Sequence, residues 1–243
     1  MTAGLVWTEI KLLAREPLVL VVSLLFPLLL MALLLVSFSD DDGTAYLGLG
    51  GATFYVTAYL SAAVAAMGFM GTPTHLASYR SSGVLRRFRA AGIRSSALLL
   101  AQIAVMAILA VVGAALMLSL AYAGWDLTGP ESAVGVVVSF GAGVLAFAAL
   151  GVFLGSVIGS ARAAQGLGLL LFFGTFFLVG GGPPPDILPD ALSTAAGWTP
   201  TGMLVDAIQS PWIGDGYNVT ALLGLGATAV IASVLAIARL ARI

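Results

Sequence analysis

The sequence predicts an all-α polytopic membrane protein with six transmembrane helices, folded as one transmembrane domain over residues 1–243. Of the 243 residues, 60% are hydrophobic and only 9% are charged, and so few charged side chains do not cover the surface of a soluble domain. Six uncharged stretches approach or exceed the roughly 20 residues that a helix needs to cross a bilayer. The basic residues are also separated from the acidic residues along the chain, which is typical of a protein with a fixed orientation in a membrane.

The first predicted element is an amphipathic surface helix over residues 2–16. In the stretch LVWTEIKLLAREP, three apolar residues fall on one helical face, Trp7 suits the membrane interface, and Lys11 and Arg15 suit lipid headgroups. Pro17 then turns the chain into the first span. A second interpretation is open, in which these residues only extend the helix of the first span.

The six predicted spans follow the uncharged stretches of the chain. They cover residues 18–38, 46–71, 97–123, 133–159, 163–180 and 219–238. The first stretch is too long for the apolar region of a signal peptide, and no small-residue cleavage site follows it, so we expect it to remain as a span. Between the last two spans, the apolar pieces 187–198 and 203–208 are too short to cross and predict short helices at the outer membrane surface. Thr199 or Thr201 is the predicted N-cap of the second of these helices.

The six spans place all ten lysine and arginine residues on one face of the membrane and nine of the eleven acidic residues on the other. By the positive-inside rule, both termini and the loop between spans 2 and 3 are predicted to be cytoplasmic. The preference for arginine over lysine, together with abundant Ala, Gly, Leu and Val, indicates a bacterial genome of high G+C content. The expected location is therefore the bacterial cytoplasmic membrane.

Residue types that many functional classes need are absent from the sequence. It contains no cysteine and a single histidine, so thiol catalysis, iron–sulfur clusters and metal sites are not expected. That histidine, His75, is predicted to be an interfacial side chain at the cytoplasmic end of span 2. The predicted spans contain no charged side chain, whereas ion-driven carriers and intramembrane enzymes need an ionisable group within the membrane. We therefore expect no catalytic site and no metal.

The loop between spans 2 and 3 contains the stretch YRSSGVLRRFRAAGIR, which has five arginines and no acidic residue. A glycine is expected to end the preceding helix, after which three apolar residues share one face of a short cytoplasmic helix. The residues of this helix are Gly83, Val84, Leu85, Arg86, Arg87, Phe88 and Arg89. Two interpretations are open. Either the arginines fix the topology and contact anionic lipid, or the helix docks into a partner, with its apolar residues inserted and its arginines at the rim.

A few polar residues within the spans are candidates to line a transport pathway. They are Tyr55, Thr57, Tyr59 and Gln102. Contacts between helices explain the same residues equally simply. In span 4, the stretch GVFLGSVIGS places Gly151, Gly155 and Gly159 at four-residue spacing, which predicts the close approach of another helix, most simply from the same chain.

Four features occur in one order along the chain: a surface helix that ends in Arg-Glu-Pro, Phe26-Pro27 in span 1, the basic loop, and a Gly-rich span 5 that runs into Pro-x-x-x-Leu-Pro. The chain resembles a permease subunit of the type-2 family of ABC exporters, near the daunorubicin-resistance-like drug and lipid efflux permeases. GVLRRFRAAGIR is similar to the coupling segment of that family, and LVGGGPPPDILPDALSTAAGWTPTGMLVDAI is similar to its final signature. The family often has acidic residues before the coupling glycine and a basic residue at the position of Gln209, whereas this chain has Ser81, Ser82 and Gln209.

The resemblance implies a half-transporter that moves a hydrophobic or amphipathic drug, natural product or lipid outward. It implies that two chains, as a homodimer or with a related permease, form the pathway above cytoplasmic ABC ATPase subunits, and that the short cytoplasmic helix is the coupling helix. The only lysine, Lys11, is followed by Leu12, so the chain lacks a phosphate-binding loop, and we expect the partner to bind ATP and this chain to hold no cofactor. Membrane lipids are expected contacts and nucleic acids are not. The alternative is a channel or scaffold without ATPase coupling.

Overall fold

The structure is a computed structural model that describes residues 7, 11, 25–38, 49–92, 95–125, 127–179, 181–182 and 189–241. These residues form helices with short connections and no strand, so the all-α prediction is confirmed for this part of the chain. Five of its helices are long and apolar enough to cross a membrane. The described helices are α3 (Phe26–Phe38), α4 (Gly51–Ala66), the π-helical turn η2 (Met67–Gly71), α5 (Thr72–Ser81), α6 (Val84–Ala90), α7 (Ser95–Gly124), α8 (Ala133–Val157), α9 (Ala161–Leu178), α10 (Asp190–Gly197), α11 (Pro200–Trp212) and α12 (Val219–Leu240).

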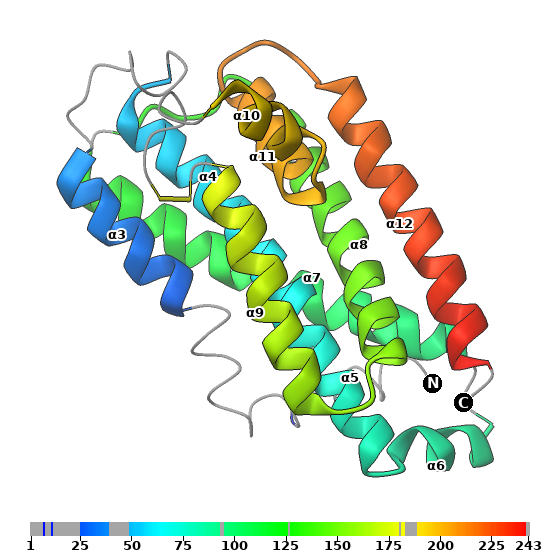
Figure 1. The fold of residues 1–243 in the computed structure, drawn as a ribbon. Helices are drawn as coiled ribbons and strands as arrows, with labels where there is room; N and C mark the ends of the chain where they lie inside the picture. Colours follow the sequence, from blue (N-terminus) through cyan, green and yellow to red (C-terminus); the bar gives the residue numbers. More distant parts are fainter. Residues whose placement is uncertain are drawn as a thin grey trace.

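The long helices form a bundle around two central segments (Figure 1). One is the continuous helix α4–η2–α5, in which the apolar 18-residue stretch that could cross a membrane is completely buried. The other is α8, which packs against α5, η2, α7, α11 and α12. By contrast, α7, α9 and α12 leave most of their apolar surface exposed on the outside of the bundle, as expected for helices that contact lipid.

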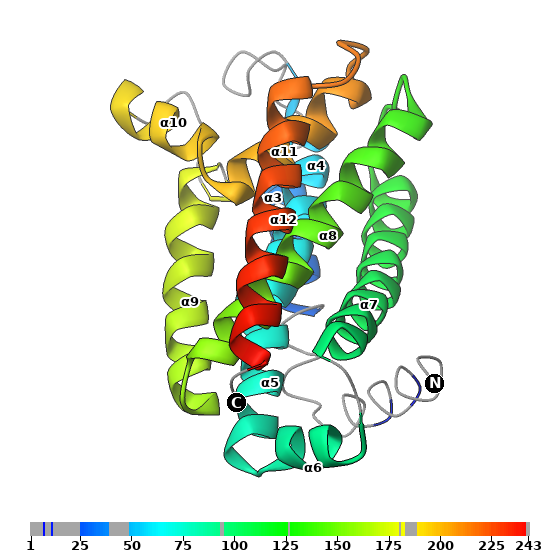
Figure 2. The ribbon, with the colours of Figure 1, turned by 90° about the vertical axis from the view of Figure 1, so that its right-hand side faces the viewer.

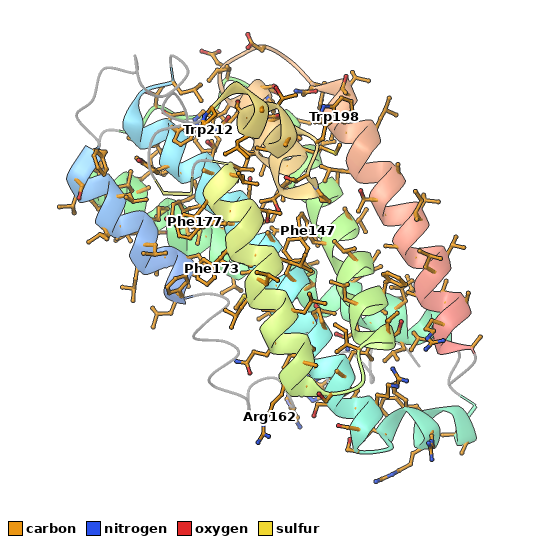
Figure 3. The ribbon with its side chains drawn as sticks, viewed as in Figure 1. Phe147, Arg162, Phe173, Phe177, Trp198 and Trp212 are labelled. Atoms are coloured by element: carbon orange, nitrogen blue, oxygen red, sulfur yellow. The ribbon has the colours of Figure 1, made fainter. Side chains whose placement is uncertain are left out.

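Short helices lie at the two opposite ends of the bundle. α10 and α11 lie at the end where α8 and α12 begin, and α6 lies at the end where they finish (Figure 2). Figure 3 shows Trp198 and Trp212 at the first of these ends and Arg162 at the second. The two ends therefore differ in the side chains that they present.

α10 and α11 correspond to the two short helices predicted before the last span. The side chain of Thr199 accepts a hydrogen bond from the N–H of Gly202 at 3.0 Å, so of the two predicted N-caps, Thr199 and Thr201, the first is the N-cap. α11 is longer than the apolar piece 203–208, because it begins at Pro200, whose missing N–H is not needed in the first helical turn.

Span 2 is the predicted element that differs most from the structure. The predicted span ends at Gly71, before a Thr-Pro-Thr sequence, but the helix continues to Ser81. The π-helical turn directly precedes this sequence, and the N–H of Thr72 donates to the carbonyl of Met67, five residues back. This wider turn lets the helix continue past Pro73, which has no N–H to donate. His75, predicted to be an interfacial side chain at the end of this span, therefore lies within the helix, six residues before its last residue. Its side chain is buried within the bundle, and its ring centroid lies 4.4 Å from that of Tyr79.

Glycines on α8 set its distance from the helix beside it. A Cβ atom at Gly151 would lie 2.7 Å from the carbonyl oxygen of Gly68, and one at Gly155 would lie 2.8 Å from Cβ of Leu76. The predicted close approach within the chain is therefore confirmed at these two positions. Gly159 lies beyond the end of α8, and a Cβ atom there would meet nothing within 4 Å, so this third glycine does not belong to the contact.

The N-terminal predictions fall largely outside the described residues. Of the first predicted span, residues 18–24 lie outside them, and the described part contains α3, a 13-residue apolar helix that is too short to cross a bilayer alone. Of the predicted surface helix, only Trp7 and Lys11 are described. Both are exposed, and Nζ of Lys11 lies 5.2 Å from the ring centroid of Trp7.

Candidate docking site

A sharp corner at Gly83 joins α5 to α6. Gly83 has a φ of 73°, in the left-handed region that favours glycine, and its N–H donates to the carbonyl of Arg80 at 3.2 Å. A Cβ atom at this position would meet nothing within 4 Å, so backbone conformation alone favours glycine. The hydroxyls of Ser81 and Ser82 both donate to the carbonyl of Ser78, at 3.0 and 2.8 Å. The two serines that depart from the family pattern therefore close the last turn of α5.

The apolar side chains of α6 face the bundle. Leu85 is only 9% exposed and belongs to a cluster that we call the inner cluster. Its buried members are Leu76, Tyr79, Leu85, Leu98, Leu99, Val152, Ala236 and Leu240, with Val84 and Phe88 packed against them. The ring of Phe88 meets the ring of Tyr79 edge-on, with 6.0 Å between centroids. The arrangement does not favour the predicted insertion of Val84, Leu85 and Phe88 into a partner, because these side chains already contact their own bundle.

The arginines of α6 lie at the surface. Arg86 and Arg87 are exposed, and Nη2 of Arg87 donates to the carbonyl of Ser82 at 3.4 Å. The side chain of Arg89 lies outside what the structure describes. α6 therefore presents a basic surface away from the bundle, and such a surface suits acidic groups of a partner protein or anionic headgroups.

Arg80 makes a specific contact that the sequence did not indicate. Its Nη1 donates to the carbonyl oxygens of Ser156, Val157 and Ile158, at 2.9, 3.1 and 3.4 Å. These carbonyls lie at the C-terminal end of α8, where helical carbonyls lack intrahelical donors and the helix dipole is negative. The residues that meet are 76 to 78 positions apart, so no local pattern could have revealed the contact.

The four candidate pathway residues are buried in this conformation. The hydroxyls of Tyr55 and Tyr59 donate to the carbonyls of Gly182 and Gly181, at 3.2 and 2.9 Å. These bonds hold the segment that follows α9 against α4. Gln102 is buried in the first turns of α7, which begins at the opposite end of the bundle (Figure 1), so the structure does not bring it together with the tyrosines.

Polar side chains also hold α11 in place. Thr57 accepts a hydrogen bond from Nε2 of Gln209 at 3.1 Å, which joins α4 to α11. The hydroxyls of Thr201 and Thr175 lie 3.0 Å apart, which joins α11 to α9. On the same short helix, burial raises the pKa of the Asp206 carboxyl. The contacts of Gln209 across helices were not predictable from its own surroundings in the sequence.

The described residues define a class of protein. They form an apolar helical bundle with a short basic helix at one end and short helices, pinned by buried polar contacts, at the other. Within the same residues, no three His, Cys, Asp or Glu side chains lie close enough together to hold a metal ion. The class is that of a multi-pass membrane protein with an exposed basic helix at one end of its bundle.

Comparison with known families identifies the group to which this protein belongs. The sequence profile of the ABC-2 family transporter proteins matches residues 42–238, which is most of the chain. The protein therefore belongs to the ABC-2 family and is a permease of that type. Comparison with curated proteins gives no match.

Proposed function

We propose that the protein is the membrane-spanning subunit of an ABC exporter and moves a hydrophobic or amphipathic compound outward with ATP hydrolysed by a separate subunit. α6 is the helix that the ATPase contacts. Family membership supports the exporter class. The observation that supports the docking role is the form of α6, a seven-residue helix that presents Arg86 and Arg87 at the surface. A glycine of positive φ directly precedes the helix, Gly83, and another follows two residues after its end, Gly92.

The packing of α6 supports a division of roles within this proposal. The apolar residues hold the helix on the inner cluster, and the exposed Arg86 and Arg87 are left for the proposed contact with the partner. In this proposal α6 does not insert its apolar face into the partner. Insertion would first require Leu85 to leave its own bundle, which would expose apolar surface to water. A helix fixed in this way moves together with the bundle when a partner pushes it.

Further parts of the proposal follow from the family and the sequence. Residues 18–38 supply the first of six spans, and α6 and both termini lie on the cytoplasmic side of a bacterial membrane. A second copy, or a related permease, completes the pathway. The exposed apolar surfaces of α7, α9 and α12 support contact with lipid or with a second chain, and the scarcity of charge in the spans supports an apolar cargo.

The docking role is tested by charge reversal on α6. The tagged chain is purified in mild detergent from the cells that naturally produce it, and the ABC ATPase that co-purifies with it is measured. We expect the double variant Arg86→Glu, Arg87→Glu to recover the ATPase about tenfold less well than the wild type, because close like charges at an interface cost more than 1.4 kcal/mol. Arg162→Glu is the matched control, since Arg162 is also exposed at the basic end of the bundle but lies outside α6 (Figure 3).

The outcomes separate the candidate functions. If the wild type recovers no ATPase, the exporter proposal fails, and a channel or scaffold without ATPase coupling becomes the better interpretation. If the wild type recovers the ATPase and the double variant recovers it equally well, the exporter class stands, but α6 is not its contact. Equal losses in the double variant and in the Arg162 control would mean that overall charge, rather than α6, determines recovery.

A further inference from the structure

The corner at Gly83, between α5 and α6, is held to the C-terminal end of α8. The guanidinium of Arg80 donates to three successive carbonyls there, those of Ser156, Val157 and Ile158. A positive charge at this place is favourable because of the unpaired carbonyls and the negative end of the helix dipole. Arg80 precedes the corner residue Gly83 by three positions, so the start of α6 and the end of α8 are held close together.

α5 and α8 are also in backbone contact above this point. Gly151 and Gly155 leave no space between the two helices, since a side chain at either position would collide with η2 or α5. Leu85 of α6 and Val152 of α8 both belong to the inner cluster. The helices are therefore packed too closely for side chains between them to absorb a displacement of α6, so the displacement is passed on to α8.

The other end of α8 is fastened to α11. The N–H groups of Glu131 and Ser132, immediately before α8, donate to the carbonyls of Trp212 and Pro211, each at 3.0 Å. Nε1 of Trp212 donates in turn to the carbonyl of Thr128 at 3.0 Å. α8 has 25 residues and, at about 1.5 Å per residue, is about 38 Å long, so it connects the two ends of the bundle directly (Figure 2).

We infer that α8 is the rigid connection that carries movement of α6 to the short helix α11. In this inference Arg80 is the positioning residue at the C-terminal end of α8. The inference rests on the proposed function, because it requires a partner that moves α6. It adds to that function the route by which the ATPase reaches the outer side. It also assigns roles to Arg80 and Trp212, which hold the two ends of α8 through contacts within the chain.

The test uses the complex of the permease with its ATPase. The chain has no cysteine, so Ile213→Cys provides a single attachment point for a bimane fluorophore at the end of α11, where the native side chain is 43% exposed. The change in bimane fluorescence between the nucleotide-free complex and the complex trapped with ATP and vanadate reports movement at the outer end. Recovery of the ATPase and its rate of ATP hydrolysis are measured in the same samples.

We expect Arg80→Gln to retain the ATPase but to reduce the fluorescence response about threefold or more, because the end of α8 is released from α5. Arg80→Lys, which keeps a charged donor, should restore most of the response, and Arg162→Gln should leave it unchanged. Trp212→Phe keeps an aromatic ring but removes the indole N–H that donates to Thr128. Because tryptophan also quenches an adjacent bimane, the response of this variant is expressed relative to its own nucleotide-free fluorescence, and it should fall as that of Arg80→Gln does. This second variant decides the question if Arg80→Gln does not accumulate in the membrane.

A full response in Arg80→Gln, or in Trp212→Phe where the first variant does not accumulate, overturns the inference. A reduced response that Arg80→Lys does not restore also overturns it, because a general loss of stability would then explain the effect. Failure of the wild-type chain to recover any ATPase is a different result, and it contradicts the proposed function instead.

Discussion

Single glycines determine how closely the helices of this bundle approach one another. Gly168 on α9 is the clearest example, because a Cβ atom there would collide with the carbonyl oxygen of Phe69 in η2. A backbone atom in a packed helix cannot move aside as a flexible side chain can. The contact therefore fixes α9 against the π-helical turn, at a place where the helix is already wider than an α-helix.

We predict that Gly168→Ala destabilises the protein by about 1–3 kcal/mol, the usual cost of overpacking a core. Thermal unfolding in detergent should show this as a lower Tm. Gly166→Ala is the control two residues away on the same helix, where a Cβ atom would meet nothing within 4 Å. Alanine there should leave Tm unchanged or raise it, since alanine favours the helix by up to about 1 kcal/mol. Equal shifts in the two variants would contradict the assigned contact.

At the scale of elements, α6 combines a fixed packing with a fixed direction. Its packing comes from Leu85 and Phe88 on the inner cluster, and its direction comes from the left-handed conformation of Gly83. Since a Cβ atom at Gly83 would meet no neighbour, substitution there changes the direction of α6 without a steric clash with the bundle. A substitution at Gly83 therefore affects the direction of α6 more than the packing of the bundle.

Gly83→Ala is expected to weaken recovery of the ATPase about fivefold to tenfold, because a left-handed alanine costs about 1–2 kcal/mol and α6 will leave its present direction. Tm of the permease should fall only by the equivalent of the same strain, about 1–2 kcal/mol. Gly83→Asn is the matched control, since asparagine tolerates positive φ much better than alanine does. If alanine and asparagine reduce recovery equally, the size of the side chain rather than the backbone conformation matters, and the explanation given for the corner is wrong.

The sequence predicted where helices begin and end better than which residues they contact. Gly83 was predictable as a helix end because a glycine stands between apolar-periodic segments, and Thr199 was predictable as a cap because a threonine precedes Pro200. The direction of the apolar face of α6 was not predictable, because the pattern of Leu85 and Phe88 is the same for a helix that binds a partner and for one that packs on its own bundle. The contact of Arg80 depends on where α8 ends in space, and no local pattern contains that information.

At the scale of the whole molecule, charge is distributed along the axis of the bundle. The described arginines lie on α5, α6, the first turn of α9 and the last turn of α12, all at one end. The exposed acidic residues Glu131 and Asp215 lie in connections at the other end, beside α11. The bundle thus matches the separation found along the sequence, and the positive-inside rule then favours a cytoplasmic position for the end that carries α6.

Orientation and the number of spans can be tested together with single cysteines, since the natural chain contributes no background. We expect Asp215→Cys to react with a membrane-impermeant maleimide in intact cells, and Arg162→Cys and Arg239→Cys to react only after the cells are permeabilised. All three native side chains are exposed. The opposite pattern would reverse the proposed orientation. Lys11→Cys decides whether residues 18–38 cross the membrane. With six spans it is protected like Arg239→Cys, whereas with the five long helices alone it reacts from outside like Asp215→Cys, because each crossing exchanges the side on which the preceding segment lies.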